Sequence, residues 1–518
     1  IIQSPHWIPF WDGIHDLARK LGFSAPCSSI SITDVPLNDC HPFEAIAKAY
    51  KEPTPQTDIY WQQMMLWGSL KICDHYGSAR IKKIYQLTDD HFSFLDRLKA
   101  KYGRLYNHQE SCAVTNGNLM LIAPTGSGKT EAAMAWLKTQ LQENQGRAYY
   151  ILPYTASINA MHRRLSRDTG AEEEAIVGIQ HGKLLDYLYT SMEDEGRPDI
   201  TTLKNLADQY RKIISPLKIV TPFQILKYAY GVKGFETGFA HLSGAKLIFD
   251  EIHAYDARTF AQLQLFLKYL ITHLKCRVMI MTATLPRFML DTLKNTLEIG
   301  SEIRADQSFL ERQPRHRIVI LDGKIGDHIH RIEAAMTDPA KKILVVCNTV
   351  LQAQTIYQML SHKLDPKERV LLHSRFTSKD RQLNEKKIFS DTTRVLVGTQ
   401  AIEVSLDIDF HVMFTEPAPM DRLLQRFGRI NRNYKHPPCP VHIFNQGGEH
   451  DHWIYPQDLV DKTLQCLAQK DLIHEHMVQE MMDEVYQNDW PEKEKKEYLD
   501  TLAAFEESIT HLYPFSMH

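Results

Sequence analysis

Residues 123–130 have the composition and the setting of a phosphate-binding loop. The segment reads Ala123-Pro-Thr-Gly-Ser-Gly-Lys-Thr130, follows the aliphatic run 119–122, and precedes a helix-forming stretch that opens at Glu131. In such a strand–loop–helix unit, backbone N–H groups cradle phosphate oxygens, the lysine reaches the β- and γ-phosphates, and the last hydroxyl holds Mg²⁺. Ala123 replaces the first glycine of the motif. We expect ATP and Mg²⁺ to bind at Thr125, Gly126, Ser127, Gly128, Lys129 and Thr130.

Two adjacent carboxylates form the second candidate site. The segment Phe249-Asp-Glu-Ile-His253 closes the aliphatic run 246–249. Neighbouring carboxylates at a strand end are commonly surface charge, but after a phosphate-binding loop the catalytic interpretation is favoured. Asp250 would then bind Mg²⁺, and Glu251 would position and deprotonate the attacking water. The hydroxyls of Met281-Thr-Ala-Thr284, at the end of the next run, are candidates to link this site to a moving domain.

Three regularly spaced arginines lie in the second half of the chain. The segment reads Gln425-Arg-Phe-Gly-Arg-Ile-Asn-Arg432, and a helical stretch would place Arg426, Arg429 and Arg432 along one side. Arginines at such a spacing are most often a solvated or nucleic-acid-facing surface. Together with a phosphate-binding loop in the other half, they suggest arginine fingers that act when two domains close. We predict that Arg429 and Arg432 are the fingers and that Gln425 lies near the γ-phosphate or its water.

The elements that position these residues are short, continuous apolar runs alternating with helical stretches. This pattern is typical of parallel sheets covered by helices on both faces, so the expected fold class is α/β with two domains in tandem. The first set of runs is 119–122, 148–152, 246–249 and 277–281, and the second is 343–346, 370–372, 395–397, 412–414 and 441–444. The predicted divisions are a helical segment at 1–100, α/β domains at 101–315 and 316–454, and a helical accessory segment at 455–518.

Composition excludes several classes of protein. With 43% hydrophobic and 24% charged residues in a chain of 518, disorder and fibrous structure are excluded. No apolar run is long enough for a membrane span, which predicts no membrane partner. The formal net charge of −3 means that any nucleic acid must be bound locally, along a groove. The eight cysteines are scattered without a Cys-x-x-Cys pair, which favours reduced thiols and a cytoplasmic location.

The ordered motifs resemble those of a superfamily 2 helicase of the DEAD/DEAH type, which implies two RecA-like domains around ATP. Longer strings resemble the CRISPR-associated helicase–nuclease of type I systems over about residues 100–450. These strings are Leu152-Pro-Tyr-Thr-Ala-Ser-Ile-Asn-Ala-Met161, His181-Gly-Lys183, Thr221-Pro-Phe-Gln224, Asp250-Glu-Ile-His-Ala-Tyr-Asp256, Leu372-His-Ser-Arg-Phe376 and Thr399-Gln-Ala-Ile-Glu-Val-Ser-Leu-Asp-Ile-Asp409.

This resemblance implies roles for further residues. Gln109 matches the position that reads adenine, and Asp407 matches the position that commonly contacts the ribose. Hydroxyls and amides suit backbone contacts that are made and released in every cycle without reading base sequence. The implied DNA contacts are Thr155, Thr221, Pro222, Asn348, Thr349, Arg375, Thr399 and Gln400.

The family also carries a metal-dependent HD nuclease ahead of the helicase. Lys71-Ile-Cys-Asp-His-Tyr-Gly-Ser-Ala79 resembles the last segment of that domain, with Asp74 as a metal ligand. His15-Asp16 is the only matching dipeptide in residues 1–70, and nothing there supplies the remaining histidines of the pattern. We therefore expect an incomplete or absent nuclease in this chain, with a transition metal bound only if the site is complete.

The predicted function is 3′-to-5′ translocation on single-stranded DNA, driven by ATP. The resemblance implies that the chain is recruited by a crRNA-guided surveillance complex and acts on the displaced non-target strand, and we expect a monomer. An RNA helicase of the DEAH type or a restriction-type DNA translocase remains an alternative. A non-enzymatic nucleic-acid-binding module with a degenerate ATP site is an alternative of another class, disfavoured because Lys129, Asp250, Glu251, Arg429 and Arg432 are all present.

Overall fold

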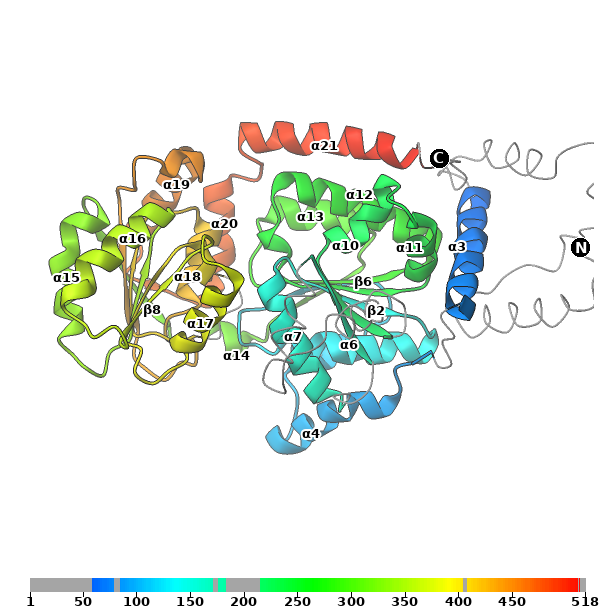
Figure 1. The fold of residues 1–518 in the computed structure, drawn as a ribbon, viewed down its shortest axis with the longest axis horizontal. Helices are drawn as coiled ribbons and strands as arrows, with labels where there is room; N and C mark the ends of the chain where they lie inside the picture. Colours follow the sequence, from blue (N-terminus) through cyan, green and yellow to red (C-terminus); the bar gives the residue numbers. More distant parts are fainter. Residues whose placement is uncertain are drawn as a thin grey trace, which may run out of the picture.

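The computed structural model describes residues 58–78, 84–170, 176–182, 215–403, 408–510 and 512. These residues form two seven-stranded sheets with helices on both faces, which confirms the predicted α/β class with two tandem domains (Figure 1). His15-Asp16 and Asp407 lie outside the described residues.

The first sheet is parallel throughout, with strand order β3-β4-β2-β5-β6-β1-β7. Its strands are β1 (Leu119–Ile122), β2 (Ala148–Ile151), β3 (Val177–Gln180), β4 (Leu217–Val220), β5 (Lys246–Phe249), β6 (Arg277–Thr282) and β7 (Ser301–Arg304). Strands β1, β2, β5 and β6 are fully or almost fully buried, as expected for strands covered on both faces. The apolar pattern missed β3, β4 and β7, because Gly178, Lys218 and Glu302 interrupt these short runs.

Helices cover both faces of the first sheet (Figure 1). One face carries α10 (Phe223–Leu226), α11 (Phe235–Leu242), α12 (Ala257–Leu274) and α13 (Arg287–Thr296), and α3 (Asp58–Ser78) packs on α11. The other face carries α4 (Ser93–Tyr102), α5 (Asn107–Val114), α6 (Lys129–Glu143), α7 (Thr155–Asp168) and α14 (Gln307–Leu310). The carboxyl ends of β1, β2, β5 and β6 therefore open between these layers, where the predicted ATP-site residues follow the strands.

The second sheet begins at His316 and has strand order β10-β11-β9-β12-β13-β8-β14. Its strands are β8 (His316–Leu321), β9 (Ile343–Val346), β10 (Arg369–Leu372), β11 (Val395–Gly398), β12 (Val412–Thr415), β13 (Cys439–Phe444) and β14 (Leu472–Ile473). All neighbours are parallel except β14, which is antiparallel to β8. Its helices are α15 (Ile329–Met336), α16 (Val350–Met359), α17 (Ser378–Ile388), α18 (Met420–Phe427), α19 (Gln457–Ala468) and α20 (Val478–Tyr486).

The segment after residue 454, predicted as one helical accessory piece, is divided between the two sheets. Strand β14 extends the second sheet, and α19 and α20 bury apolar residues in its core. The last helix, α21 (Glu492–Thr510), instead runs across α12 and α13 of the first sheet (Figure 1). Phe505 and Ile509 of this helix are buried in the core of the first domain. The charged run that opens α21 is thus the start of a packed helix.

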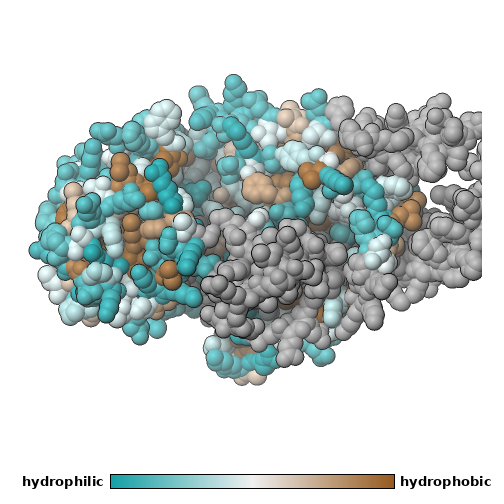
Figure 2. Space-filling model, in the orientation of Figure 1, coloured by the Kyte–Doolittle hydropathy of each residue, from teal (hydrophilic) through white to brown (hydrophobic). Residues whose placement is uncertain are grey.

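The visible surface mixes hydrophilic residues with separate small groups of apolar ones (Figure 2). In the part of the chain that the structure describes, no helix combines the length and the apolar character that crossing a membrane requires. The six described cysteines are free thiols.

Candidate functional site

The phosphate-binding loop has the predicted strand–loop–helix geometry between β1 and α6. Gly126 and Gly128 both have a φ of +84°, in the left-handed region that favours glycine. A Cβ on Gly128 would lie 2.1 Å from Nε2 of Gln109, so a larger residue here would displace the Gln109 side chain. Helix α6 starts at Lys129, and its free N–H groups therefore point towards the loop.

Side chains around the loop suit an anionic ligand. Lys129 is buried and its Nζ donates to the carbonyl of Ala123 at 3.1 Å, which holds the ammonium inside the loop. The Oγ of Ser127 is buried and has no hydrogen-bond partner among the described residues. Because buried polar atoms are almost always paired, this hydroxyl and the free N–H groups of α6 fit a phosphate ligand.

Gln109 and His108 hold the loop from α5. The Gln109 side chain accepts from the Tyr106 N–H at 3.0 Å and donates to the Gly128 carbonyl at 3.0 Å. Sequence reasoning missed His108, which is buried with one ring nitrogen 2.9 Å from the Ser127 carbonyl and the other 3.2 Å from Asp306. His108 adjoins Gln109 in the sequence, but only the fold brings both residues against the loop.

Asp250 and Glu251 follow β5 and face the same cavity. Asp250 is buried and accepts from the Tyr150 hydroxyl at 2.8 Å and from the Glu251 N–H at 3.0 Å. Burial, reinforced by the charge of Glu251, raises the pKa of Asp250 to about 6. Glu251 has a φ of +57°, an uncommon conformation for a residue with a side chain, and such residues cluster at functional sites.

Neighbouring positive charges lower the pKa of Glu251. Burial acts to raise its pKa, but Lys129, His253, Arg429 and Arg432 together outweigh burial and lower it. His253 lies with Nε2 3.2 Å from Glu251 and Nδ1 2.9 Å from the Thr282 hydroxyl, which itself donates to the Thr284 carbonyl at 2.8 Å. The Thr282 hydroxyl at the end of β6 is therefore in contact with His253, the residue that pairs with Glu251.

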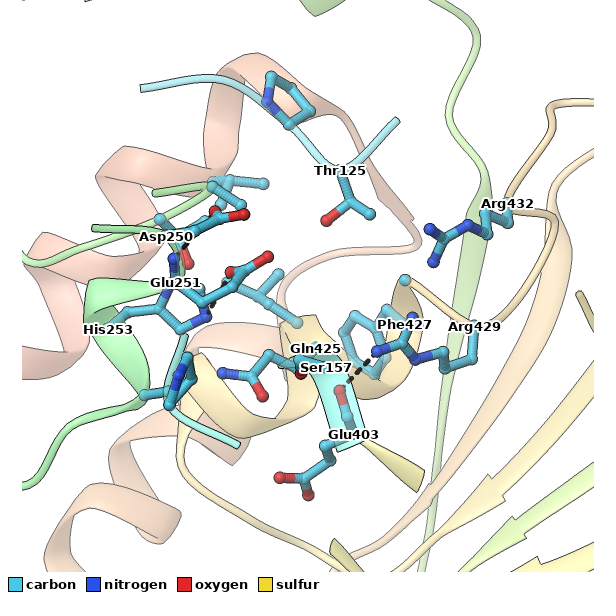
Figure 3. Close-up of a pocket in the computed structure, with 18 of the residues that line it drawn as sticks. Thr125, Ser157, Asp250, Glu251, His253, Glu403, Gln425, Phe427, Arg429 and Arg432 are labelled. Carbon is cyan, nitrogen blue, oxygen red and sulfur yellow. Dashed lines mark hydrogen bonds and ion pairs between the residues drawn. The ribbon is translucent and has the colours of Figure 1, made fainter. Parts of the chain in front are cut away.

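One cavity of about 340 Å³ gathers residues from both domains (Figure 3). Thr125, Asp250 and Glu251 line it from the first domain, and Gln425, Arg429 and Arg432 line it from the second. The Nε2 of Gln425 is a buried donor without a hydrogen-bond partner in the described structure. The structure thus brings the predicted arginines and glutamine opposite the predicted carboxylates.

The predicted helical alignment of the three arginines is wrong. Helix α18 ends at Phe427, because the chain turns at Gly428 and then forms an isolated bridge at Ile430. Arg426 is consequently separated from the other two and is fully buried in the second domain. Arg429 remains at the cavity, where its guanidinium donates to the carbonyls of Ile402 and Glu403 at 3.3 and 2.5 Å (Figure 3).

The predicted DNA-contact residues lie at carboxyl ends of strands in both sheets. Thr155 begins α7, and Thr221 and Pro222 follow β4. In the second sheet, Asn348 and Thr349 follow β9, Arg375 follows β10, and Thr399 and Gln400 follow β11. Arg375 is exposed, whereas the Thr349 hydroxyl accepts from the Gln352 N–H and caps α16.

Thr221, Thr399 and Asn348 are buried, and the hydrogen bonds of Asn348 bear directly on its predicted role. The Asn348 amide donates to the Pro417 carbonyl at 2.8 Å and to Asp451 at 2.5 Å, and its carbonyl oxygen accepts from Arg426 at 3.0 Å. These bonds occupy the side chain, so a direct contact with DNA is not available to it in this conformation. Asn348 instead fixes the loops around it.

Asp74, the candidate ligand of an HD-type metal site, lies exposed on α3. Among the residues that the structure describes, no group of three or more His, Cys, Asp or Glu side chains could hold a metal ion.

Two regions of the chain match known protein families. Residues 107–292 match the DEAD/DEAH box helicase family, and residues 339–435 match the family described as CRISPR-associated nuclease/helicase Cas3, C-terminal. The chain is thus similar to Cas3 proteins, with a DEAD/DEAH box helicase region followed by a region like the Cas3 C-terminal part. This finding confirms the resemblance seen in the motifs.

Cas3 proteins from several organisms are similar to this chain. The putative CRISPR-associated nuclease/helicase Cas3 of Methanocaldococcus jannaschii is 28% identical over 401 residues, covering 72% of this chain and 53% of the relative. The Cas3 of Methanothermobacter thermautotrophicus is 28% identical over 468 residues, covering 85% of this chain and 54% of the relative. The chain therefore spans about half the length of these relatives.

Solved Cas3 structures share the fold. The crystal structure of T. fusca Cas3-AMPPNP has a TM-score of 0.65 and 20% identity, covering 82% of this chain and 58% of that one. A chain from a structure described as "CRISPR RNA-guided surveillance complex, pre-nicking" has a TM-score of 0.55 and 21% identity, covering 79% of this chain and 54% of that one. These likenesses support the tandem RecA-like architecture.

Proposed function

We propose that this chain is an ATP-driven motor that moves 3′ to 5′ along single-stranded DNA and unwinds target DNA during CRISPR interference. The observation that carries this proposal is the cavity between the two domains. Carboxylates of the first domain face Gln425, Arg429 and Arg432 of the second across it. Such a site works only when the domains close, which converts ATP turnover into relative domain movement.

The loop and its neighbours would bind ATP. Backbone N–H groups of residues 125–130 and the Lys129 ammonium would hold the phosphates, and Gln109 would contact the adenine. Mg²⁺, when bound, neutralises phosphate charge and orients the phosphates. Thr130 and Asp250 would hold it, since hard oxygen ligands suit this ion.

Hydrolysis would be assisted by residues on both sides of the cavity. Glu251, kept ionised by the surrounding positive charge, would accept a proton from the attacking water, and His253 would hold the carboxylate in place. The unpaired amide of Gln425 suits a contact with that water or the γ-phosphate. Arg429 and Arg432 would stabilise charge that develops in the transition state.

The nucleic-acid path would cross the carboxyl ends of both sheets. Thr155, Thr221 and Pro222 would contact the strand from the first domain, and Thr349, Arg375, Thr399 and Gln400 from the second. Contacts of this kind, made to the backbone, tolerate any sequence. The displaced non-target strand would reach this path after a CRISPR RNA-guided surveillance complex recruits the chain, a proposal supported by the solved relative described in such a complex.

The test is ATP turnover by the purified chain with single-stranded DNA, with RNA of the same sequence, and without nucleic acid. We expect stimulation by DNA and little by RNA, with no turnover by a Glu251→Gln control. Partial duplexes with a 3′ or a 5′ overhang would then report direction, and only the 3′ overhang should be unwound. Preferential stimulation by RNA would indicate an RNA helicase, and absence of turnover a non-enzymatic module.

A further inference from the structure

Tyr150 reaches the metal-binding carboxylate from a neighbouring strand. It lies on β2, which pairs with β5 in the sheet, and its side chain is fully buried. Its hydroxyl donates to Oδ2 of Asp250 at 2.8 Å, while Oδ1 accepts from the Glu251 N–H at 3.0 Å. Each carboxylate oxygen thus has one fixed donor, and the carboxylate plane cannot rotate freely.

The other proposed metal ligand, Thr130, is held from α7. Its hydroxyl accepts from Nη1 of Arg164 at 3.1 Å. Tyr150 and Arg164 therefore each donate to one of the two proposed metal ligands. A hydroxyl oxygen has two acceptor sites, so Thr130 retains one for a further ligand.

Arg164 is itself held in place on α7. Its guanidinium forms an ion pair with Glu131, in the first turn of α6, and lies 3.6 Å from Asp168. Arg164 also lines the cavity between the domains. Helix α7 is therefore joined to α6 by an ion pair at Glu131, the residue next to Thr130.

We propose that Tyr150 and Arg164 are positioning residues that hold the Thr130 hydroxyl and the Asp250 carboxylate at the spacing required by the Mg²⁺ of a bound nucleotide. This inference rests on the proposed function, in which these two groups are the metal ligands. Mg²⁺ demands near-ideal octahedral geometry, so fixed ligands bind it better than mobile ones. Loss of such an outer hydrogen-bond partner typically weakens metal binding by about 10–100-fold.

The simpler alternative is that Tyr150 is a core residue whose hydroxyl has merely found a partner. In that case its hydroxyl would affect folding stability but not the metal. Tyr149 offers a matched comparison, because it lies on the same strand, is also buried, and packs on the opposite face of the sheet.

The first test compares Tyr150→Phe with Tyr149→Phe. Binding of a fluorescent, non-hydrolysable ATP analogue is titrated with Mg²⁺, and thermal unfolding without ligand reports the fold. We expect Tyr150→Phe to raise the Mg²⁺ concentration for half-maximal binding by about 10-fold or more. Tyr149→Phe should leave it close to the wild-type value, and saturating Mg²⁺ should restore most of the turnover of Tyr150→Phe.

A second pair of variants tests the donor that holds the Thr130 hydroxyl. Arg164→Gln should shift the Mg²⁺ dependence in the same direction, whereas Arg167→Gln, at an exposed arginine on the same helix, should not. Equal Mg²⁺ dependence of Tyr150→Phe and Tyr149→Phe would overturn the inference while leaving the proposed function intact. A wild-type chain without Mg²⁺-dependent nucleotide binding would overturn both.

Discussion

Asp250 and Glu251 are neighbours in the sequence, yet their surroundings shift their pKa values in opposite directions. Burial and the adjacent carboxylate raise the pKa of Asp250, whereas Lys129, His253 and two arginines outweigh burial and lower the pKa of Glu251. An ionised Glu251 suits proton acceptance. With a pKa of about 6, Asp250 is already mostly ionised near neutral pH, and a cation beside it would favour the ionised form further.

The first prediction separates nucleotide binding from hydrolysis at these residues. Glu251→Gln should abolish turnover but still bind ATP with Mg²⁺, because the proposed metal ligand Asp250 remains. Lys129→Ala should lose both, since it removes the charge that holds the phosphates. Turnover and fluorescent-nucleotide binding are the measurements, and circular dichroism checks the fold. Normal hydrolysis in either variant would contradict the assigned site.

The second prediction concerns two arginines only three positions apart. Arg429→Ala should lower DNA-stimulated turnover by about 10³-fold with little change in nucleotide affinity, as expected for a finger that acts in the transition state. Arg426→Ala should instead destabilise the fold by about 3–5 kcal/mol, because it leaves Glu403 buried without its partner. Steady-state kinetics and urea unfolding measure the two effects. An Arg429→Ala variant that changed only KM would indicate simple ground-state binding.

At the scale of elements, a buried network joins the carboxyl ends of the strands in the second sheet. Arg426 donates to Glu403, Thr415 and Asn348, and the Asn348 N–H donates to Glu416 at 2.6 Å. These residues follow or close β9, β11 and β12. The network therefore fixes the loops that carry the proposed DNA contacts relative to one another.

The third prediction uses the pH dependence of this network. Burial, with a smaller contribution from Asp451, outweighs the Asn348 N–H, Arg426 and Lys324 and raises the pKa of Glu416 to about 7. Because the pKa of Glu416 is raised in the folded state, protonation of Glu416 favours folding. The stability that the protonated form contributes is present below the ordinary carboxyl pKa and is lost as the pH rises through about 7. Glu416→Gln, which cannot ionise, should therefore be more stable than the wild type at pH 8, by about 1–3 kcal/mol.

Urea unfolding at about pH 5 and pH 8 measures this difference, which should shrink at the lower pH. Glu449→Gln, at an exposed glutamate, is the matched control and should be neutral at both. A Glu416→Gln variant less stable than the wild type at pH 8 would show that the carboxylate is favourably paired in the folded protein.

At the scale of the whole molecule, the C-terminal segment ties the two domains together. Helices α19 and α20 pack in the second domain, while α21 lies on the first, with Tyr498 hydrogen-bonded to Gln264 at 2.5 Å and Arg258 paired with Glu497 at 3.1 Å. The Arg287 N–H also donates to Asp483 of α20 at 2.8 Å, across the domains. Any closure of the domains would therefore have to alter both the connection between α20 and α21 and the Arg287–Asp483 contact.

The fourth prediction is that this chain alone will not cleave DNA, even with transition metal and ATP. An HD-type site needs several His and Asp ligands that converge on metal ions and activate water. Asp74 is exposed on α3, and the described residues contain no cluster that could hold a metal ion. Metal-dependent nicking of circular single-stranded DNA is the assay. Robust nicking that Asp74→Ala abolishes would show a complete nuclease site in this chain.

The sequence by itself identified the site residues that belong to a short, continuous motif. The loop from Ala123 to Thr130, the Asp250-Glu251 pair and Arg429 could be predicted because short strands and Gly-rich turns place such residues at strand ends whatever packs around them. The α/β class followed from the apolar runs, since strands covered on both faces must be apolar throughout. Strands β4 and β3 were not predicted, because a charged residue and a glycine, respectively, interrupt their apolar runs.

Only the tertiary structure decided which residues meet. Arg426 and Arg429 have the same residue type and a helical spacing, but the end of α18 at Phe427 buries one and leaves the other at the cavity. His108, Tyr150 and Arg164 reach the site from α5, β2 and α7, and nothing in their local sequence marks them. The physical reason is that a hydrogen bond between distant segments depends on sheet order and helix packing, which arise from the whole core and not from any single segment.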